Sequence, residues 1–261
     1  MALPRFQRYI GIDYSGAKTL SASLKGLRVY AADRTCTPQE VQPSLSPRKY
    51  WTRRETAEWL VERFSEGPPT LVGIDHGFSF PIQYFEKYGL PLDWPSFLDD
   101  FQRHWPTDED IYVDFVRDGS TGNAAARSGN PRWRRVTELR ARSAKSVFQF
   151  DVQGSVAKST HAGIPWLRYI RQQVGDRIHF WPFDGWDVPP NRLVVAEVYP
   201  ALWNRTFPTE GRTPDQQDAF AIAKWMQGAD IDGSLEKFFC PSLQPDERKK
   251  AEIEGWILGV L

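Results

Sequence analysis

The sequence predicts an α/β fold in which buried strands end in acidic residues and alternate with amphipathic helices. Residues 9–13 (YIGID) and 71–75 (LVGID) are short apolar runs that end in the same tripeptide, Gly-Ile-Asp. A third run, residues 193–197 (LVVAE), also ends in an acid. A carboxylate at the end of a buried strand is costly unless a positive or protic group meets it. Three such ends suggest that the acids meet one another around a metal ion.

The size and composition of the chain are those of an ordinary globular protein. Its 261 residues allow one α/β domain over residues 1–261 that carries a large insertion. The composition is 41% hydrophobic and 25% charged, which argues against disorder and against a coiled coil. The 33 basic and 33 acidic residues balance, so the net charge neither favours nor excludes nucleic acid as a partner.

The start of the chain and its cysteines indicate a cytoplasmic protein. Residues 1–5 (MALPR) lack the apolar segment of a secretory signal. The sequence has no apolar run of the roughly 20 residues that a membrane span needs, so no membrane partner is expected. Cys36 and Cys240 have no metal-binding spacing, and we expect reduced thiols.

Hydrophobic patterning predicts the order βββαβ for the first part of the chain. Strands are expected at residues 8–14, 19–25, 27–33 and 70–75. Gly26 separates the second and third of these and predicts a tight hairpin. Residues 52–64 have the apolar spacing of a helix, and the Pro-, Ser- and Thr-rich residues 34–50 are expected to be a loop.

The regular alternation stops after the fourth strand, and residues 77–150 are expected to be an insertion. Within it, residues 81–88 and 94–104 have short helical patterns. Further elements are expected as a helix at 155–173 that is interrupted near 163–165 (GIP), strands at 177–181 and 192–198, and helices at 213–227 and 245–259. Residues 213–216 (TPDQ) form a capping box with proline at the first helical position.

The first two strand-end acids each follow a glycine by two residues. Since side chains alternate along a strand, Gly11 shares a face with Asp13, and Gly73 shares a face with Asp75. Glycine leaves space beside each acid. Ligands of open α/β sheets collect at the carboxyl ends of the strands, where these acids and Glu197 are expected to lie.

The helix at 213–227 adds two further acids. Asp218 is in register with Ile222 and Trp225, on the apolar side of the helix, where a carboxylate needs a partner. Asp215 lies one turn earlier on the same side. An acid in the first turn also favours the helix dipole, so Asp215 has an ordinary structural explanation as well.

An acidic cluster of this kind predicts a hard divalent cation. Mg²⁺ binds through carboxylates, substrate phosphates and water, and pairs of such ions assist phosphodiester cleavage. The histidines and cysteines show no matching ligand spacing, which favours Mg²⁺ or Mn²⁺ over Zn²⁺. The expected metal ligands are Asp13, Asp75, Asp215 and Asp218.

The order βββαβαβα, with acids on the first and fourth strands and on the last helix, resembles the ribonuclease H-like superfamily. Six segments are similar to a branch of predicted RNase H-like nucleases: residues 9–15 (YIGIDYS), 72–76 (VGIDH), 148–156 (FQFDVQGSV), 197–200 (EVYP), 215–219 (DQQDA) and 254–257 (EGWI). Residues 90–145 match no segment of that branch. The resemblance implies a mixed five-stranded sheet flanked by helices, with the insertion after the fourth strand.

The same resemblance implies a metal-dependent nuclease that hydrolyses phosphodiester bonds of nucleic acid. Its catalytic residues would be Asp13, Asp75 and Asp218, with Asp215 assisting. Glu197 belongs to the pattern of this branch and joins the candidate catalytic residues. RNase H proper also places a glutamate on the helix after the third strand, and here Glu55, Glu58 and Glu62 all qualify. Holliday-junction resolvases instead take the second acid from a strand, which is closer to this pattern.

Charge within the expected insertion is divided into an acidic half and a basic half. Residues 93–118 hold eight acids against two arginines, and residues 127–145 hold seven bases against one acid. The group Arg132, Trp133, Arg134 and Arg135 could follow a phosphate backbone and stack on a base. Alternatively, the basic segment is a solvated loop that pairs with its acidic neighbour.

Two other classes of function are compatible with the sequence. Actin-like ATP-dependent phosphotransferases also open with a Gly-x-Asp strand, and Ser15 and Gly16 could contact a phosphate. That fold repeats its domain, however, and 261 residues with a large insertion leave little room for a second copy. The other class is a non-catalytic nucleic-acid-binding or structural protein that retains the fold.

Overall fold

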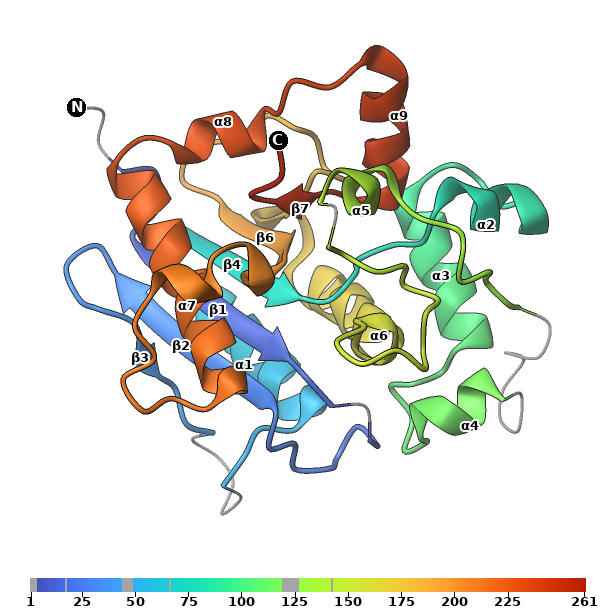
Figure 1. Ribbon diagram of the computed structural model, residues 1–261, viewed down its shortest axis with the longest axis horizontal. Helices are drawn as coiled ribbons and strands as arrows, with labels where there is room; N and C mark the ends of the chain where they lie inside the picture. The colour runs from blue at the N-terminus through green and yellow to red at the C-terminus, as the bar shows by residue number, and fades with distance from the viewer. Residues whose placement is uncertain (1–3, 17, 44–48, 66, 119–126, 142) are drawn as a thin grey trace.

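A mixed β-sheet forms the centre of the protein, which confirms the α/β class. The computed structural model describes residues 4–16, 18–43, 49–65, 67–118, 127–141 and 143–261. Its strands are β1 (Arg8–Tyr14), β2 (Leu27–Asp33), β3 (Gln39–Glu40), β4 (Thr70–Asp75), β5 (Ile178–Trp181), β6 (Leu193–Val198) and β7 (Ile257–Leu258). They lie in the order β3-β2-β1-β4-β6-β5, and β7 pairs with β6 (Figure 1).

Strand β2 runs opposite to the other strands of the sheet. Strands β1, β2 and β3 pair antiparallel, whereas β4, β6 and β5 continue parallel to β1. The register of β1 and β4 sets Gly11 beside Gly73 and Asp13 beside Asp75. The two Gly-Ile-Asp segments therefore end side by side, at the carboxyl ends of the parallel strands.

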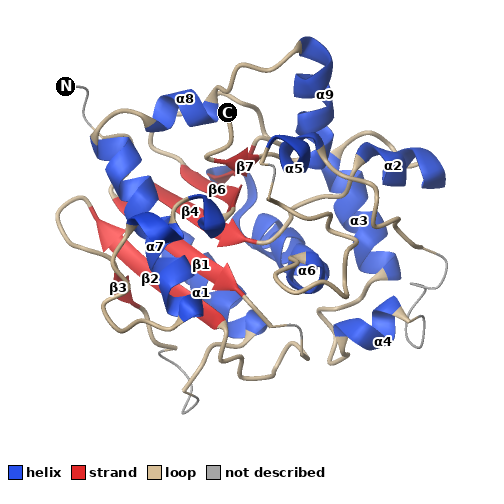
Figure 2. Cartoon of the chain, in the orientation of Figure 1, coloured by secondary structure: helices blue, strands red, loops and turns tan. Residues whose placement is uncertain are grey.

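Helices cover both faces of the sheet, as Figure 2 shows. Their bounds are α1 (Arg53–Ser65), α2 (Ile82–Tyr88), α3 (Trp94–His104), α4 (Val113–Arg117), α5 (Val136–Arg140), α6 (Ala157–Val174), α7 (Pro214–Ile231), α8 (Leu235–Phe239) and α9 (Pro245–Glu254). Helix α7 packs on β1, β2 and β4, whereas α1 and α6 pack on each other beneath the opposite face. The alternation of buried side chains along the strands supplies a separate apolar core to each face.

The first loop differs from the expected hairpin. Residues 19–25 form turns and no strand, and the third strand is β3, within the expected loop at 34–50. Leu20 and Leu24 are buried although they lie in turns, which explains why their pattern resembles a strand. The backbone N–H of Leu24 donates to the Trp51 carbonyl, so this segment is held by the chain before α1.

Helix α6 continues through Pro165 without the expected interruption. Proline has no N–H, so the His161 carbonyl four residues earlier loses its helical donor. The Thr107 hydroxyl donates to that carbonyl instead, and Arg53 Nη1 donates to the next one, of Ala162, at 3.1 Å. Contacts from distant segments thus replace the missing helical bond.

The segment between β4 and α6 contains α2, α3, α4 and α5, where only the first two were expected. Helix α3 packs on α6, and α5 packs on α9. The expected last helix ends early, at Glu254, where Gly255 has a φ of 81°, and β7 follows. Helix α8 was not expected. Within the described ranges, no helix is long and apolar enough to cross a membrane.

Candidate functional site

The two strand glycines allow α7 to lie directly on the sheet. A β-carbon on Gly73 would stand 2.7 Å from Ile222 Cγ2 and 2.9 Å from Val198 Cγ1. Helix α7 equally crowds Gly11. The space that was expected beside each acid is therefore filled by α7. This close approach carries the start of the helix, with Asp215 and Asp218, to the ends of β1 and β4.

Asp13 is buried at the end of β1 and is oriented by the residue two positions later. Its Oδ1 accepts hydrogen bonds from the Ser15 backbone N–H at 3.0 Å and from the Ser15 hydroxyl at 2.7 Å. Burial raises the pKa of Asp13 well above its usual range, and the Asp218 and Asp215 charges add to this against the Ser15 hydrogen bonds. The Ser15 hydroxyl, which could have met a phosphate, is thus committed to Asp13.

Asp75 lies beside Asp13 and has no compensating partner among the described residues. No hydrogen bond or ion pair from them reaches its carboxylate, although the side chain is largely enclosed. Burial raises the pKa of Asp75 well above its usual range, and the charges of Asp13, Asp218 and Glu197 raise it further. A partly enclosed carboxylate among like charges is the arrangement that a bound cation relieves.

Asp218 joins this pair from α7. Asn204 Nδ2, in the short helix η4 (Asn204–Thr206), donates to Asp218 Oδ1 at 2.7 Å. Burial raises the pKa of Asp218, and the charge of Asp215 adds to the rise. The pKa of Asp215 is also raised by burial, while Arg28 and Lys25 lower it. Asp215 therefore lies between the acids and two bases.

Glu197 lies near Asp75 but is held by other partners. It is paired in register with Ile74 rather than with Asp75, so its side chain leaves the sheet on the face opposite α7. Arg135 Nη2 and Nη1 donate to its two carboxylate oxygens at 2.6 and 2.7 Å, and the Phe78 N–H donates at 3.1 Å. Both of its carboxylate oxygens are thus engaged by the protein. The candidate site consequently excludes Glu197.

The expected nucleic-acid cluster does not form one surface. Arg135 is 1% exposed and also pairs with Glu138, at 2.9 Å. The guanidinium of Arg134 donates to the carbonyls of Glu138 and Ala144. Arg132 is exposed, while Trp133 is half-buried. Only Arg132 retains the exposure that contact with a phosphate backbone requires.

Other bases of residues 127–145 are also engaged within the protein. Arg127 pairs with Asp100 at 2.6 Å, which is the expected alternative of a basic segment meeting its acidic neighbour. Arg140 pairs with Glu247 at 2.7 Å. Arg142 lies outside the described residues. Internal ion pairs and hydrogen bonds therefore engage much of the basic segment at residues 127–145.

A cation that sequence reasoning did not single out lies near Asp75. A small cavity of about 20 Å³ is lined by Asp75, Glu197, Arg135, Tyr199 and Lys145, among others. That volume admits about one water molecule. Lys145 donates to the Gln153 carbonyl, which keeps the loop before α6 beside this cavity. Lys145 was visible in the sequence only as one of seven bases in a row of similar charges.

The carboxylates supply hard oxygen donors, but they are not gathered into a complete cage. Within the described ranges, no group of three or more His, Cys, Asp or Glu residues is close enough to hold a metal ion. Mg²⁺ needs only one or two carboxylates when water and substrate oxygens complete its shell. Asp13 and Asp75, adjacent in register and with oxygens free, fit that requirement.

Comparison with known proteins adds no relative. No protein-family model, no curated protein and no solved structure matches the chain. The class that the fold and the site define is an α/β protein with an acidic cluster at the ends of two adjacent parallel strands. Function must be inferred from that cluster.

Proposed function

We propose that this protein is a metal-dependent nuclease that hydrolyses phosphodiester bonds of nucleic acid. The observation that carries the proposal is the register pair Asp13 and Asp75, which lie side by side, Asp13 buried and Asp75 partly enclosed, with raised pKa values, and which Asp218 approaches. Two carboxylates that lie this near to each other repel unless a cation binds between them. A hard divalent ion, Mg²⁺ or Mn²⁺, matches their oxygen chemistry.

The arrangement of elements supports the same proposal. Strands β1, β2 and β3, helix α1 and strand β4 follow in the order that the resemblance to the ribonuclease H-like superfamily implies, with acids on the first and fourth strands. The acidic helix is α7, although α8 and α9 follow it. Strands β5 and β7 extend the sheet beyond five strands. The structure thus agrees with the resemblance at the strand-end acids. It differs from the implied five-stranded sheet at β5 and β7.

Each acid has a distinct part in the proposed site. Asp13 and Asp75 would hold the ion, and Ser15 keeps the Asp13 carboxylate oriented through Oδ1. A bound divalent ion would stabilise the charge on the attacking and leaving oxygens. Asp218, held by Asn204, has a raised pKa that suits accepting a proton from the attacking water.

The test combines metal binding with cleavage. Calorimetry with Mn²⁺ should show binding to the wild-type protein, and Mn²⁺ should raise its melting temperature. Asp13→Asn and Asp75→Asn should each abolish both effects and also the Mn²⁺-dependent cleavage of DNA or RNA substrates. Asp33→Asn is the matched control. Asp33 also ends a strand, β2, but β2 is antiparallel to β1, so Asp33 lies beside Arg8 at the other end of the strands.

The outcomes separate the proposal from its main alternative. Absence of heat and of a melting shift at millimolar Mn²⁺ would refute the metal site. Metal binding without cleavage of any nucleic acid would refute the nuclease and favour a non-catalytic protein. That alternative has one observation in its favour, since the described residues include no preformed three-ligand group.

A further inference from the structure

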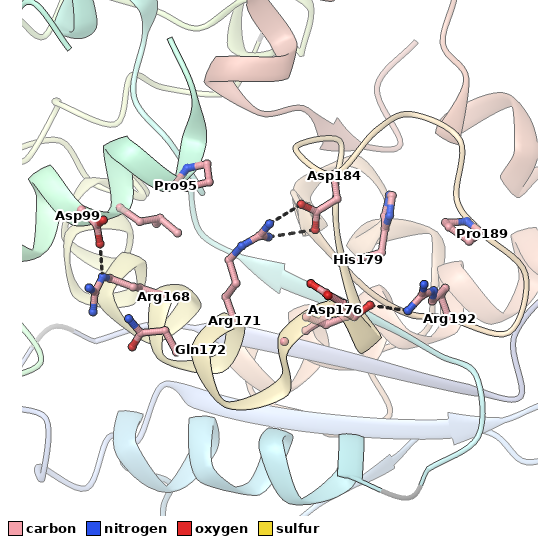
Figure 3. Close-up of a pocket in the computed structure, with 13 residues that line it drawn as sticks. Pro95, Asp99, Arg168, Arg171, Gln172, Asp176, His179, Asp184, Pro189 and Arg192 are labelled. Atoms are coloured by element: carbon pink, nitrogen blue, oxygen red, sulfur yellow. Dashed lines mark hydrogen bonds and ion pairs between the residues drawn. The ribbon is translucent and has the colours of Figure 1, made fainter. Parts of the chain in front are cut away.

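A second cavity lies at the opposite end of the parallel strands from the acids. It has a volume of about 550 Å³ and is bounded by α3, α6, the start of β5 and the loop that leads into β6. Figure 3 shows the polar side chains that converge on it. Its volume is within the roughly 300–1,000 Å³ of small-molecule sites. We call it the arginine pocket after Arg168, Arg171 and Arg192.

Two of the three arginines have carboxylate partners. Arg171 makes a two-pronged pair with Asp184, at 2.7 and 3.0 Å, and lies over the rings of Trp94 and Phe180. Arg168 Nε donates to Asp99 at 2.7 Å. These dashed pairs in Figure 3 neutralise both charges and hold both guanidinium groups in place.

Arg192 is different. Its only hydrogen bond with the described residues goes from Nη1 to the backbone carbonyl of Asp176. No carboxylate of those residues lies within 4.0 Å of its guanidinium group. The other lining acid, Asp176, is exposed to solvent. Arg192 therefore presents a positive charge, with Nε and Nη2 available, at the wall of the pocket.

His179 also lines the arginine pocket. Its ring Nε2 faces the Gly185 carbonyl at 2.9 Å, so in the neutral ring Nε2 carries the proton and Nδ1 is an acceptor. Burial lowers the pKa of His179, and the charges of Arg192 and Arg171 lower it further against Asp184. The imidazole is thus kept neutral, mainly by burial, at the wall of the pocket.

An added peptide strand is excluded as the occupant. Strand β5 is an edge strand of the sheet, but the backbone groups on its outer side already have hydrogen-bond partners. The Phe180 N–H donates to Asp184 Oδ2 at 2.7 Å, and the Phe180 carbonyl accepts from the Asp184 N–H at 2.9 Å. The Ile178 N–H donates to Gly175. The pocket is therefore suited to a small molecule.

We propose that the arginine pocket binds a small organic anion. Its phosphate or carboxylate group would pair with Arg192, and its apolar part would lie against Leu98 and Ile178, which also line the pocket. Planar guanidinium matches both kinds of oxyanion. The site is separate from the acidic cluster and does not depend on the proposed nuclease activity.

The experiment uses two probes that share a ring and differ in the anionic head, phenyl phosphate and benzoate. Each is titrated into the full chain at millimolar concentration, in EDTA so that no metal recruits the anion to Asp13 and Asp75. Binding of at least one probe is expected by calorimetry. The uncharged analogue benzyl alcohol should bind more weakly. The probe that binds more tightly identifies the head group.

Arg192→Gln should weaken that binding by about tenfold or more, since one charge-assisted hydrogen bond is lost. Arg177→Gln is the matched control, because Arg177 also gives one hydrogen bond to a backbone carbonyl, of Ser65, but does not line the pocket. Both variants should melt as the wild type does without ligand. Failure of both probes to bind, or equal binding by Arg192→Gln, would overturn the proposal.

A variant that leaves Arg192 intact guards against a folding artefact. Asp75→Asn changes the acidic cluster only and should bind the probe as the wild type does. Tighter probe binding by this variant would place the anion at the acidic cluster, because the substitution removes a negative charge there, and would refute the arginine pocket.

Discussion

Gly11 lies so close to Ala219 that a β-carbon on it would stand 2.3 Å from the Ala219 carbonyl oxygen. The same β-carbon would be 2.7 Å from the backbone nitrogen of Ala223. Backbone atoms of a packed helix cannot move aside singly, so any side chain here would displace α7 itself. The position of Asp218 over the ends of β1 and β4 therefore depends on a glycine on the strand beneath it.

Gly11→Ala should consequently destabilise the protein. We expect the free energy of unfolding to fall by about 1–3 kcal/mol or more, which is the usual cost of overpacking a core. Gly228→Ala is the control within α7, because a β-carbon there meets nothing within 4 Å. It should stabilise by about 0.5–1 kcal/mol through helix propensity. Urea unfolding measures both, and equal stabilities would show that α7 does not lie as close as described.

The acids of the site should make stability depend on pH in an unusual direction. The pKa values of Asp13 and Asp75 are raised mainly by burial, so the folded state binds more protons than the unfolded state above about pH 3.9. Stability in EDTA should then fall as pH rises from that value toward the raised pKa values. Asp75→Asn should be more stable than the wild type near neutral pH and equal to it in acid.

Asp33 should change the pH dependence of stability in the opposite direction. Hydrogen bonds from the backbone of Thr35 and Cys36 lower the pKa of Asp33 to about 2. Its contribution to stability is present above the ordinary value of about 3.9 and is lost as pH falls toward 2. Asp33→Asn should therefore be less stable than the wild type at neutral pH, and the difference should shrink in acid. Melting temperatures across pH would contradict the assignment of Asp75 if both variants changed in the same direction.

The buried pair of Arg135 and Glu197 should contribute through structure rather than through nucleic acid. Arg135→Gln leaves Glu197 buried without its cation, which costs about 3–5 kcal/mol. Arg132→Gln, on the exposed neighbour, should change stability by no more than about 0.5 kcal/mol. Chemical denaturation compares the two. If Arg135→Gln unfolded with the wild-type midpoint, the ion pair would not hold the segment after β4 in place.

Local sequence signals located the parts of the site that depend on neighbours along the chain. Strands β1 and β4 begin and end where their apolar runs predicted, and Thr213 caps α7 as the capping box indicated. Alternation along β1 and β4 also placed Gly11 and Asp13 on one face. These features follow from periods of two and of 3.6 residues, which a single sequence displays.

Contacts between distant segments decided what the sequence did not show. The hydrogen-bond donor that supports α6 at Pro165 is the hydroxyl of Thr107, so no residue near Pro165 in the sequence predicts it. Arg135 was expected to contact nucleic acid as part of a basic run, because its partner Glu197 lies 62 residues away. A charge run and a buried ion pair have the same local pattern, and only the tertiary partner distinguishes them.

Asp218 offers the sharpest test, because its catalytic and structural interpretations predict opposite effects on stability. Asp218→Asn is nearly isosteric and removes the charge that Asp215 opposes. Asn204 Oδ1 is buried without a hydrogen-bond partner among the described residues, and the new amide would offer it a donor. The variant should therefore melt at or above the wild-type temperature in EDTA.

Activity should respond in the other direction. Loss of a positioned carboxylate should lower nucleic-acid cleavage by about 10²–10⁴-fold. Asp215→Asn is the control one turn away, where Arg28 and Lys25 share the acid, and it should retain more activity. Cleavage rates and melting curves of both variants, measured side by side, decide the role. A marked fall in melting temperature for Asp218→Asn with unchanged cleavage would assign Asp218 to the scaffold, because a structural acid is needed for folding and a catalytic one is not.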